Sequence, residues 1–494
     1  MLDGDDQHFL SVTNRNPVLT GTTPVEASNQ EPFTLDVRGA GFDAASTLSL
    51  RRTADALTIP FTIASRGSHT TITAHVTPSA YVTGPCDVEV RDPDGKSAVL
   101  AGGLDLLGFR AAPAVLRQLT GADAASGFTP RDSAYDATNG RVLLSLYEGK
   151  SVALVLFDPA TLTVVDTLVL SVADFGISGT LQRPRVAWDR VTGTFAVGLV
   201  AGQANQGYAI VRVVTATNLH DTRLQSFLVS AIANVSEVTP AANDDDGGYL
   251  VVWEQGKAAY SNDDVKAQVI TPLLTLGGPP TTIASNPTGP LAQSVLAYQG
   301  NRRFVVAWMG PTKNSVIDFA IHATVVDAAG VQTSDGPYVT ATSTAWAGLL
   351  QPEIAANPDD GSMLVAFTYV DGNVPRPAVQ RLAPGDARPG PYSAIAGGTE
   401  LLAGYTDSIR WNPARGEFVL AMTLVSVRVA VRRVDPDGTI RAAPVLESYE
   451  GIWGILWAGP QAGQFGLARA FDGVADGVHD MATQLMQIVA GPSR

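Results

Sequence analysis

A short motif recurs seven times along the chain at nearly even intervals, and this repeat constrains the fold more than any other feature of the sequence. Each copy has an apolar residue, usually large, just after a turn that is usually marked by glycine. These anchor residues are Val142, Phe195, Tyr249, Phe304, Met363, Phe418 and Phe465. Successive anchors are 53, 54, 55, 59, 55 and 47 residues apart. Self-similarity at such a period indicates stacked copies of one supersecondary unit, and seven copies fit from about residue 129 to residue 494.

The residues before each anchor predict a tight hairpin turn. In five copies Asp or Asn stands four residues before the glycine: Asp136, Asp189, Asn243, Asn357 and Asn412. These side chains bond their own backbone at the start of a turn, and glycine then supplies the positive φ that closes it. A calcium loop is an alternative interpretation of Asp244, Asp245 and Asp246. The equivalent turns of other copies keep the Asp or Asn and the glycine but lack the three aspartates, which favours a hairpin turn without calcium.

The strand that follows each turn is apolar on both faces, one bulky and one slim. Tyr249, Val251 and Trp253 are bulky, whereas the residue three places after the anchor is small in most copies, as at Gly198 and Ala307. A sheet that is buried on both faces has this pattern, and blades stacked around an axis bury both faces of every sheet. We therefore predict an all-β fold with a seven-bladed β-propeller over residues 114–494.

The last copy ends after its third strand, and residues 114–120 are expected to supply the fourth. The segment 114–136 has the same layout as 337–357, with an outer strand, a loop and an inner strand. We predict that 114–120 pairs with the C-terminal blade and closes the ring. Closure removes two sheet edges that would otherwise promote aggregation.

Residues 16–107 lie outside the repeat and predict a β-sandwich, because about seven short strands follow one another at the spacing typical of that fold. The motifs of this stretch are Pro17, Pro24, the G-x-G-F turn at Gly39, Gly41 and Phe42, and DPDG at 92–95. In these motifs it resembles the IPT/TIG family of immunoglobulin-like domains. The resemblance implies a spacer or a partner-binding module of a surface protein. Residues 1–15 are then a tail, and residues 108–113 a short connector.

The sequence pattern of the repeats resembles that of uncharacterised propeller repeats in large bacterial secreted and cell-surface proteins. The pattern P-x-I-A followed by G-x-x-L-V-A-F occurs at 352–367, and I-x-A-x-x-V-D-x-x-G occurs at 321–330. The acidic start of the chain has no apolar core of a signal peptide. We expect an extracellular or cell-surface location, reached after removal of a leader or by another route, with a cytoplasmic location as the alternative.

Charge and composition exclude several classes of function. The net charge of −14 opposes binding to nucleic-acid phosphates or to an anionic membrane surface. No apolar run approaches the roughly 18 residues that a membrane span needs. The single cysteine, Cys86, excludes an internal disulfide and is expected to be a buried, inert thiol.

Sequence motifs for catalysis or metal binding are absent. The chain contains no G-x-S-x-G, H-E-x-x-H, C-x-x-C or phosphate-binding P-loop motif. The histidines are scattered, with no pair at ligand spacing: His8, His69, His75, His220, His322 and His479. We expect no metal and no cofactor.

Acidic residues at the starts of two strands are candidates for a site at the ring's centre. Asp132 and Glu353 occupy equivalent places, four residues before the turn Asp or Asn, and Arg185, Thr239 and Ser408 occupy that place in three other copies. Two interpretations stay open. The residues line a solvated channel mouth, or they are the carboxylates of a glycoside hydrolase or lyase.

Two arginines break the repeat pattern. Arg410 stands where other copies carry alanine, and Arg469 stands where they carry a large apolar residue. A buried guanidinium needs an acidic partner or water. Each arginine therefore forms a structural ion pair between blades, or the two mark an anion-recognising point near the axis.

Variable loops between strands carry the aromatic residues Tyr260, Trp346 and Tyr405, which are candidates for binding because aromatic side chains anchor interfaces. The favoured hypothesis is a non-enzymatic binding or scaffold protein with a protein or glycan partner. A carbohydrate-active enzyme with carboxylates over the channel is the second hypothesis. A structural subunit of a larger assembly, with the front domain as docking element, is the third.

Overall fold

The computed structural model describes most of the chain. The described residues are 16–29, 32–67, 69–78, 84–107, 114–116, 129–161, 163–203, 206–221, 226–230, 235–256, 264–285, 291–311, 319–334, 337–343, 352–371, 374–397, 400–401, 404–413, 415–425, 428–441, 446–450, 452–458, 464–471 and 480–487. They fall into two compact units, one with residues 16–107 and one with residues 114–486. The fold is all-β, and its one helical element among these residues is the short 3-10 helix η1 (Val172–Phe175).

Unit 1 consists of two four-stranded sheets. The first has the order β1 (Val18–Thr23), β3 (Phe33–Ala40), β6 (Thr71–Val76) and β5 (Phe61–Gly67). The second has the order β2 (Glu26–Ser28), β8 (Ser97–Leu107), β7 (Gly84–Arg91) and β4 (Thr47–Arg52). Val37 and Leu50, one from each sheet, belong to the same buried cluster, so the sheets share one core. Cys86 is fully buried in this core, and burial raises the pKa of its thiol to about 12, as expected for an inert cysteine.

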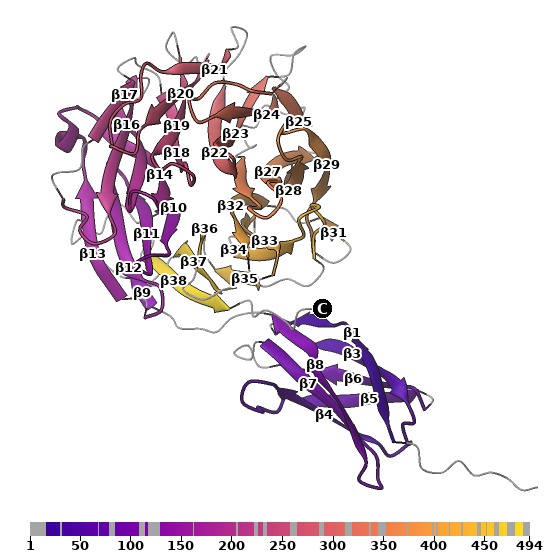
Figure 1. Ribbon diagram of the computed structural model, residues 1–494. Helices are drawn as coiled ribbons and strands as arrows, with labels where there is room; N and C mark the ends of the chain where they lie inside the picture. Colours follow the sequence, from indigo (N-terminus) through magenta and orange to yellow (C-terminus); the bar gives the residue numbers. More distant parts are fainter. Residues whose placement is uncertain are drawn as a thin grey trace, which may run out of the picture. The chain divides into compact units, whose positions relative to one another are not determined.

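Unit 2 contains seven four-stranded sheets among its described residues, and Figure 1 shows them in chain order. We number them sheets 1 to 7. Sheet 1 holds β10 (Thr129–Asp136), β11 (Arg141–Glu148), β12 (Ser151–Asp158) and β13 (Thr163–Leu170). Sheet 2 holds β14 (Thr180–Asp189), β15 (Thr194–Gln203), β16 (Gln206–Thr215) and β17 (Ser226–Ser230). Sheet 3 holds β18 (Val235–Ala242), β19 (Tyr249–Gln255), β20 (Asp264–Ile270) and β21 (Thr281–Ser285).

The remaining sheets follow the same plan. Sheet 4 holds β22 (Ala292–Gly300), β23 (Arg303–Pro311), β24 (Phe319–Asp327) and β25 (Tyr338–Ser343). Sheet 5 holds β26 (Glu353–Ala356), β27 (Met363–Asp371), β28 (Val374–Leu382) and β29 (Pro389–Ala394), and the small pair β30 (Ala396–Gly397) and β31 (Glu400–Leu401) follows it. Sheet 6 holds β32 (Gly404–Asn412), β33 (Glu417–Leu424), β34 (Arg428–Val434) and β35 (Leu446–Glu450). Sheet 7 holds β36 (Ile452–Ala458), β37 (Gln464–Phe471), β38 (Asp480–Gln487) and β9 (Ala114–Leu116).

The first strands of the seven sheets contact one another in sequence, and the labelled ones, such as β14, β18 and β22, lie on the inner side of unit 2 (Figure 1). We call these seven strands the inner strands. Each inner strand contacts the inner strand of the next sheet, in the order β10, β14, β18, β22, β26, β32, β36, and β36 contacts β10 in turn. The inner strands therefore surround a common axis, and the four-stranded sheets are consistent with propeller blades.

The second strand of each sheet, such as β15 in sheet 2 or β19 in sheet 3, has a slim face and a bulky face. The slim face of one sheet packs against the bulky face of the next sheet. Gly198 in sheet 2 pairs with Arg185 of the inner strand. A Cβ atom at Gly198 would lie only 2.1 Å from the carbonyl oxygen of Val238 in sheet 3. The bulky Tyr249 and Trp253 of sheet 3 are buried in one cluster with side chains of sheet 2. Close approach of the next sheet thus explains why one face of each strand is slim.

The predicted hairpin turns are confirmed. The Asp189 carboxylate accepts a hydrogen bond from the Val191 amide at 2.8 Å, and Gly193 has φ 68°. Asn243 and Gly247 repeat this arrangement in sheet 3. The Asp189 side chain also accepts the Gly248 amide of the next sheet at 2.6 Å, so the turn residue connects two sheets.

Strand β9 is the fourth strand of sheet 7, as predicted for this part of the chain. Its residues pair antiparallel with β38, with Val115 opposite Ala482 and Leu116 opposite Met481. Residues from both ends of unit 2 therefore share one sheet. Residues 117–120 lie outside the described part. The described residues contain no helix long and apolar enough to span a lipid bilayer.

Candidate functional site

Seven equivalent residues of the inner strands, each ten places before its anchor, form the framework of the candidate site. We call them the collar residues: Asp132, Arg185, Thr239, Ser294, Glu353, Ser408 and Ile455. An irregular register occurs at this level in β10, β14, β18, β22, β32 and β36, and β26 begins at its collar residue. Such bulges redirect side chains and are frequent beside functional sites.

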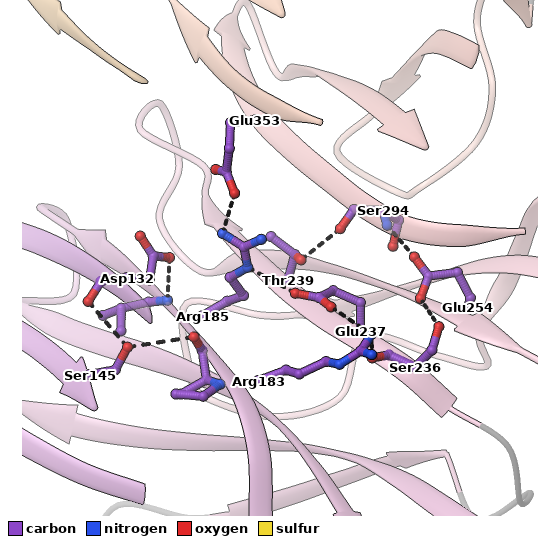
Figure 2. Close-up of polar contacts among 12 residues, drawn as sticks. Asp132, Ser145, Arg183, Arg185, Ser236, Glu237, Thr239, Glu254, Ser294 and Glu353 are labelled. Carbon is purple, nitrogen blue, oxygen red and sulfur yellow. Dashed lines mark hydrogen bonds and ion pairs between the residues drawn. The ribbon is translucent and has the colours of Figure 1, made fainter. Parts of the chain in front are cut away.

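Arg185 of sheet 2 connects acidic side chains of two other sheets (Figure 2). Its Nε atom donates to Glu237 Oε1 of sheet 3 at 2.9 Å, and its Nη1 atom donates to Glu353 Oε1 of sheet 5 at 2.7 Å. Burial by itself would lower the pKa of Arg185, but the nearby acids Glu353, Glu237 and Asp132 raise it. Arg185 is therefore a fixed positive charge at the centre of the collar.

Asp132 and Arg410 form a second connection. Arg410 Nη2 donates to Asp132 Oδ1 at 2.8 Å and to the Ser133 carbonyl at 3.1 Å. The other carboxylate oxygen of Asp132 accepts the backbone amide of Val186 at 2.9 Å. Arg410 thus has an acidic partner, which is one of the two possibilities expected from the sequence, and the pair joins sheet 6 to sheet 1.

Side chains that accept backbone amides of the next inner strand recur around the ring. The Ser294 amide donates to the carboxylate of Glu254 in sheet 3, which also accepts the Ser236 hydroxyl at 2.6 Å (Figure 2). The Gly454 amide donates to Asp407 Oδ2 of sheet 6 at 2.9 Å. Irregular register leaves strand amides without ladder partners, and these acids satisfy them from the neighbouring sheet.

A polar cavity of about 290 Å³ lies at the N-terminal ends of the inner strands. Every lining residue is a collar residue or lies one or two places before one: Pro130, Arg131, Arg183, Pro184, Arg185, Glu237, Gln293, Pro352, Glu353, Thr406, Asp407 and Ile455. All seven sheets contribute. We call this space the axial cavity, and its volume matches the small end of ligand-binding pockets.

A second cavity of about 300 Å³ lies further along the inner strands, toward the hairpin turns. Its wall includes Ala187, Ala241, Leu296 and Trp188, and Arg185 and Glu353 line it as well. Because both cavities share these two charged residues, the Arg185–Glu353 ion pair lies between them.

Burial shifts the ionisation of several groups in the axial cavity. Burial raises the pKa of Asp407 to about 7, although hydrogen bonds from Thr423 and Gly454 oppose the shift. Burial also raises the pKa of Glu353, despite the neighbouring Arg185. The pKa of Arg131 is lowered by burial, with Glu237 partly offsetting the effect. An arginine nevertheless stays charged at physiological pH.

Three of the residues predicted as site members line the two cavities, and the others lie elsewhere or outside the described part. Asp132 and Glu353 are collar residues, and Glu353 lines both cavities while Asp132 and Arg410 line the second. The prediction that Tyr405 lies in a loop is wrong, because Tyr405 pairs with Thr423 in the β32–β33 ladder and its side chain is partly exposed. The backbone of Arg469 lies in β37, but its side chain is outside the described part.

Two further predicted residues, Tyr260 and Trp346, also lie outside the described residues. Five charged or amide residues of the axial cavity were not predicted from the sequence: Arg131, Arg183, Glu237, Gln293 and Asp407. A signal existed, because each of them is a charged or amide residue one or two places before a collar residue. Without the register of the inner strands, nothing indicated that these places face the axis.

The acidic turn that could have been a calcium loop has other partners. Asp246 forms an ion pair with Arg302 at 2.6 Å, and Asp245 accepts the Arg302 amide at 3.0 Å. The carbonyl oxygen of Asp244 accepts hydrogen bonds from Arg190. Within the described residues, no three His, Cys, Asp or Glu side chains converge to hold a metal ion.

Comparisons with known proteins give only weak likenesses. No protein-family model and no curated protein matches the sequence. A structure of the RRP9 WD40 repeats is similar at 10% identity and a TM-score of 0.46, over 76% of this chain and 97% of that chain. The polysaccharide lyase Uly1 is similar at 11% identity and a TM-score of 0.48, over 75% and 92%. An auxiliary nutrient binding protein from Bacteroides thetaiotaomicron is similar at 12% identity and a TM-score of 0.40, over 82% and 95%. At TM-scores below 0.5 these likenesses carry no argument about function.

Proposed function

We propose that the protein is a non-enzymatic binding or scaffold protein whose axial cavity holds part of a glycan or protein partner. In this proposal sheets 1 to 7 are the blades of a seven-bladed β-propeller that β9 closes. Unit 1 is an immunoglobulin-like spacer or docking module of the IPT/TIG type. The proposed place of action is the cell surface or exterior, following the resemblance of the repeats to bacterial surface proteins.

Backbone strain at the axial cavity is the observation that carries this proposal. Arg183 and Gln293 have φ of 51° and 56°, which side chains other than glycine rarely adopt. They are the two such residues inside strands among the described residues, since the others lie in turns. Both line the same cavity. Strain of this kind persists where it positions a functional group.

The wall of the cavity is pre-organised for binding. Arg183 Nη1 is held by the Ser236 carbonyl at 2.7 Å and by Glu237 Oε2 at 3.3 Å. Arg185 is held by two carboxylates, as described above. Because these contacts fix the side chains before a ligand arrives, a ligand that matches them loses little free energy in ordering the site.

A binding screen on the full chain tests the proposal. Glycan and peptide arrays are probed with the wild type, with Arg183→Asn and with Arg388→Gln. Asn tolerates positive φ, so the first variant removes the guanidinium without adding strain. Arg388 is an exposed arginine of unit 2 that lines neither cavity described above, and it serves as the matched control.

We expect the wild type and the Arg388 variant to capture the same partner, and Arg183→Asn to lose most of that binding while its unfolding temperature stays unchanged. Equal capture by all three proteins would place the binding site elsewhere. Loss of folding in the Arg183 variant, measured by circular dichroism, would show that Arg183 is structural rather than functional.

A carbohydrate-active enzyme is the second candidate, and one observation favours it. Asp407 and Glu353 line the same cavity, and burial raises the pKa of both carboxyl groups. A carboxylic acid that stays protonated near pH 7 can serve as a general acid. Turnover of a polysaccharide in a substrate screen, abolished by Asp407→Asn, would favour the enzyme over the binding protein.

A further inference from the structure

Guanidinium groups dominate one side of the axial cavity. Arg131 comes from sheet 1, and Arg183 and Arg185 come from sheet 2. The carboxyl groups of the wall come from other sheets: Glu237 from sheet 3, Glu353 from sheet 5 and Asp407 from sheet 6. The contacts of Arg183 with Ser236 and Glu237 use only its Nη1 atom, and a guanidinium has five N–H donors. The wall can therefore donate further hydrogen bonds to a ligand.

The opposite side of the cavity presents acceptors without partners. Among the described residues, neither Gln293 Oε1 nor Asp407 Oδ1 has a hydrogen-bond partner, although both atoms are buried. The other carboxylate oxygen of Asp407 accepts the Thr423 hydroxyl and the Gly454 amide. A buried polar atom without a partner is costly, so a ligand with hydroxyl groups would stabilise this side of the site.

The charge of the wall depends on Asp407. The charged groups that act on it are Glu353, which raises its pKa, and Arg131, which lowers it, in addition to the larger effect of burial. Below pH 7 Asp407 is largely protonated and the three guanidiniums outnumber the two remaining carboxylates. The cavity then carries an excess of positive charge, which favours an anionic group.

We propose that the axial cavity binds an acidic sugar, a hexuronate residue, with its carboxylate at Arg131 and Arg183 and its hydroxyl groups at Gln293 and Asp407. This inference rests on the proposed binding function and names the ligand class of the same site. Guanidinium groups bind carboxylates through paired, charge-assisted hydrogen bonds. One sugar residue suits a cavity of about 290 Å³.

A peptide carboxylate fits the cavity less well than a uronate. It would satisfy the guanidinium groups but would bring few hydroxyl groups. A hydroxyl group can donate to Gln293 Oε1, and it can either donate to Asp407 Oδ1 or accept from that oxygen when it carries the proton. The rest of the wall consists of the polar Thr406 and of apolar surfaces from Pro130, Pro184, Pro352 and Ile455. These surfaces can pack against the C–H face of a sugar ring. The observations therefore favour the acidic glycan.

Calorimetric titration of the full chain tests the inference at pH 6. The probes are methyl glucuronide and methyl galacturonide, the matching neutral methyl hexosides, and N-acetylglycine as a peptide carboxylate. We expect a uronide to bind at least about tenfold more tightly than its neutral hexoside, the effect of about one charge-assisted hydrogen bond. Arg183→Asn should abolish this preference, and Arg388→Gln should keep it.

The pH dependence gives an independent readout. Uronide binding by the wild type should weaken between pH 6 and pH 8, as Asp407 loses its proton. Asp407→Asn mimics the protonated state and should remove this dependence. Equal affinity for uronide and hexoside, or tighter binding of N-acetylglycine, would overturn the acidic-sugar assignment.

The failure of this inference can be told apart from failure of the proposed function. A partner found on the arrays that needs Arg183 but contains no uronate would end the inference and leave the binding function standing. A partner that binds the Arg183 variant as tightly as it binds the wild type would show that the axial cavity is not the binding site, and would contradict both the inference and the proposed function. Binding of a uronide with the predicted preference and pH dependence would support both.

Discussion

Arg410 and Asp132 form an ion pair that joins the sixth sheet to the first and so bypasses the seventh. Nη2 of Arg410 lies 2.8 Å from Oδ1 of Asp132, and the two side chains are 26% and 14% exposed. The remaining Asp132 oxygen accepts the Val186 amide of sheet 2. One carboxylate therefore links three sheets, which supports the structural interpretation of Arg410 over an anion-binding one.

Replacing Arg410 by Ala should destabilise unit 2 without affecting ligand binding at the axial cavity. Removing one partner of a buried pair leaves an uncompensated charge, and partial exposure of Arg410 reduces the expected cost to about 2 kcal/mol. Chemical unfolding of Arg410→Ala, Asp132→Asn and the double variant measures the coupling. If the two single losses simply add, the ion pair does not contribute to stability.

Closure by β9 predicts that a disulfide across the closing pair will stabilise the ring. Val115 and Ala482 are direct partners in the β9–β38 ladder, and paired strand residues lie within disulfide range. In Val115→Cys/Ala482→Cys the bond would close a loop of nearly the whole of unit 2, which restricts the unfolded chain. We expect the unfolding temperature to rise on oxidation and to fall back with reductant.

The single variant Val115→Cys is the control. It should form no disulfide within the chain, because the other cysteine, the native Cys86, is buried and cannot exchange readily. A double variant that fails to oxidise in the folded state would contradict the pairing of β9 with β38. Oxidation without a rise in unfolding temperature would show that closure contributes little to the stability of the ring.

The sequence was sufficient to predict the sheets and turns because their determinants are local. Asp189 and Gly193 mark a turn by their own hydrogen bonding and φ preference. The slim Gly198 indicates a face that another sheet approaches closely. These features recur in the copies of the repeat, so the strands and turns predicted in one copy support those predicted in the others.

The candidate site was harder to predict because it depends on irregular register and on closure of the ring. Arg183 and Gln293 are not glycine, so nothing in their identity reveals a positive φ. The Arg185–Glu353 contact joins residues 168 positions apart. Which charges meet across the axis depends on how many sheets close the ring, which spacing alone does not determine.

A fully buried ion pair in sheet 6 gives a further prediction. Arg433 donates from Nε and Nη2 to both carboxylate oxygens of Glu417 at 2.6–2.8 Å, and each side chain is 1% exposed. Arg433→Met should cost about 3–5 kcal/mol, because it removes the two-pronged partner of a buried carboxylate and leaves only Asn412 and the more distant Arg415 beside it among the described contacts. Glu417→Met/Arg433→Met should recover most of that loss in urea unfolding. A double variant less stable than the single one would refute this assignment.

Glu254 and Asp407 predict that stability falls as the pH rises from about 4 to about 7. Burial raises the pKa of each to about 7, with Glu237 adding to the effect at Glu254. Carboxyl groups of the unfolded chain titrate near pH 4. Between these values the folded protein binds more protons than the unfolded chain, so the free energy of unfolding decreases with pH.

The neutral variants Glu254→Gln and Asp407→Asn isolate this effect. Each should flatten the decline between pH 5 and pH 7 in urea unfolding, because a group that cannot ionise carries no penalty at high pH. Relative to the wild type, each variant should therefore gain stability at pH 8. Arg388→Gln should keep the wild-type slope. An unchanged slope in both neutral variants would mean that these carboxyl groups ionise normally in the folded protein, since only a raised pKa couples their protonation to folding in this range.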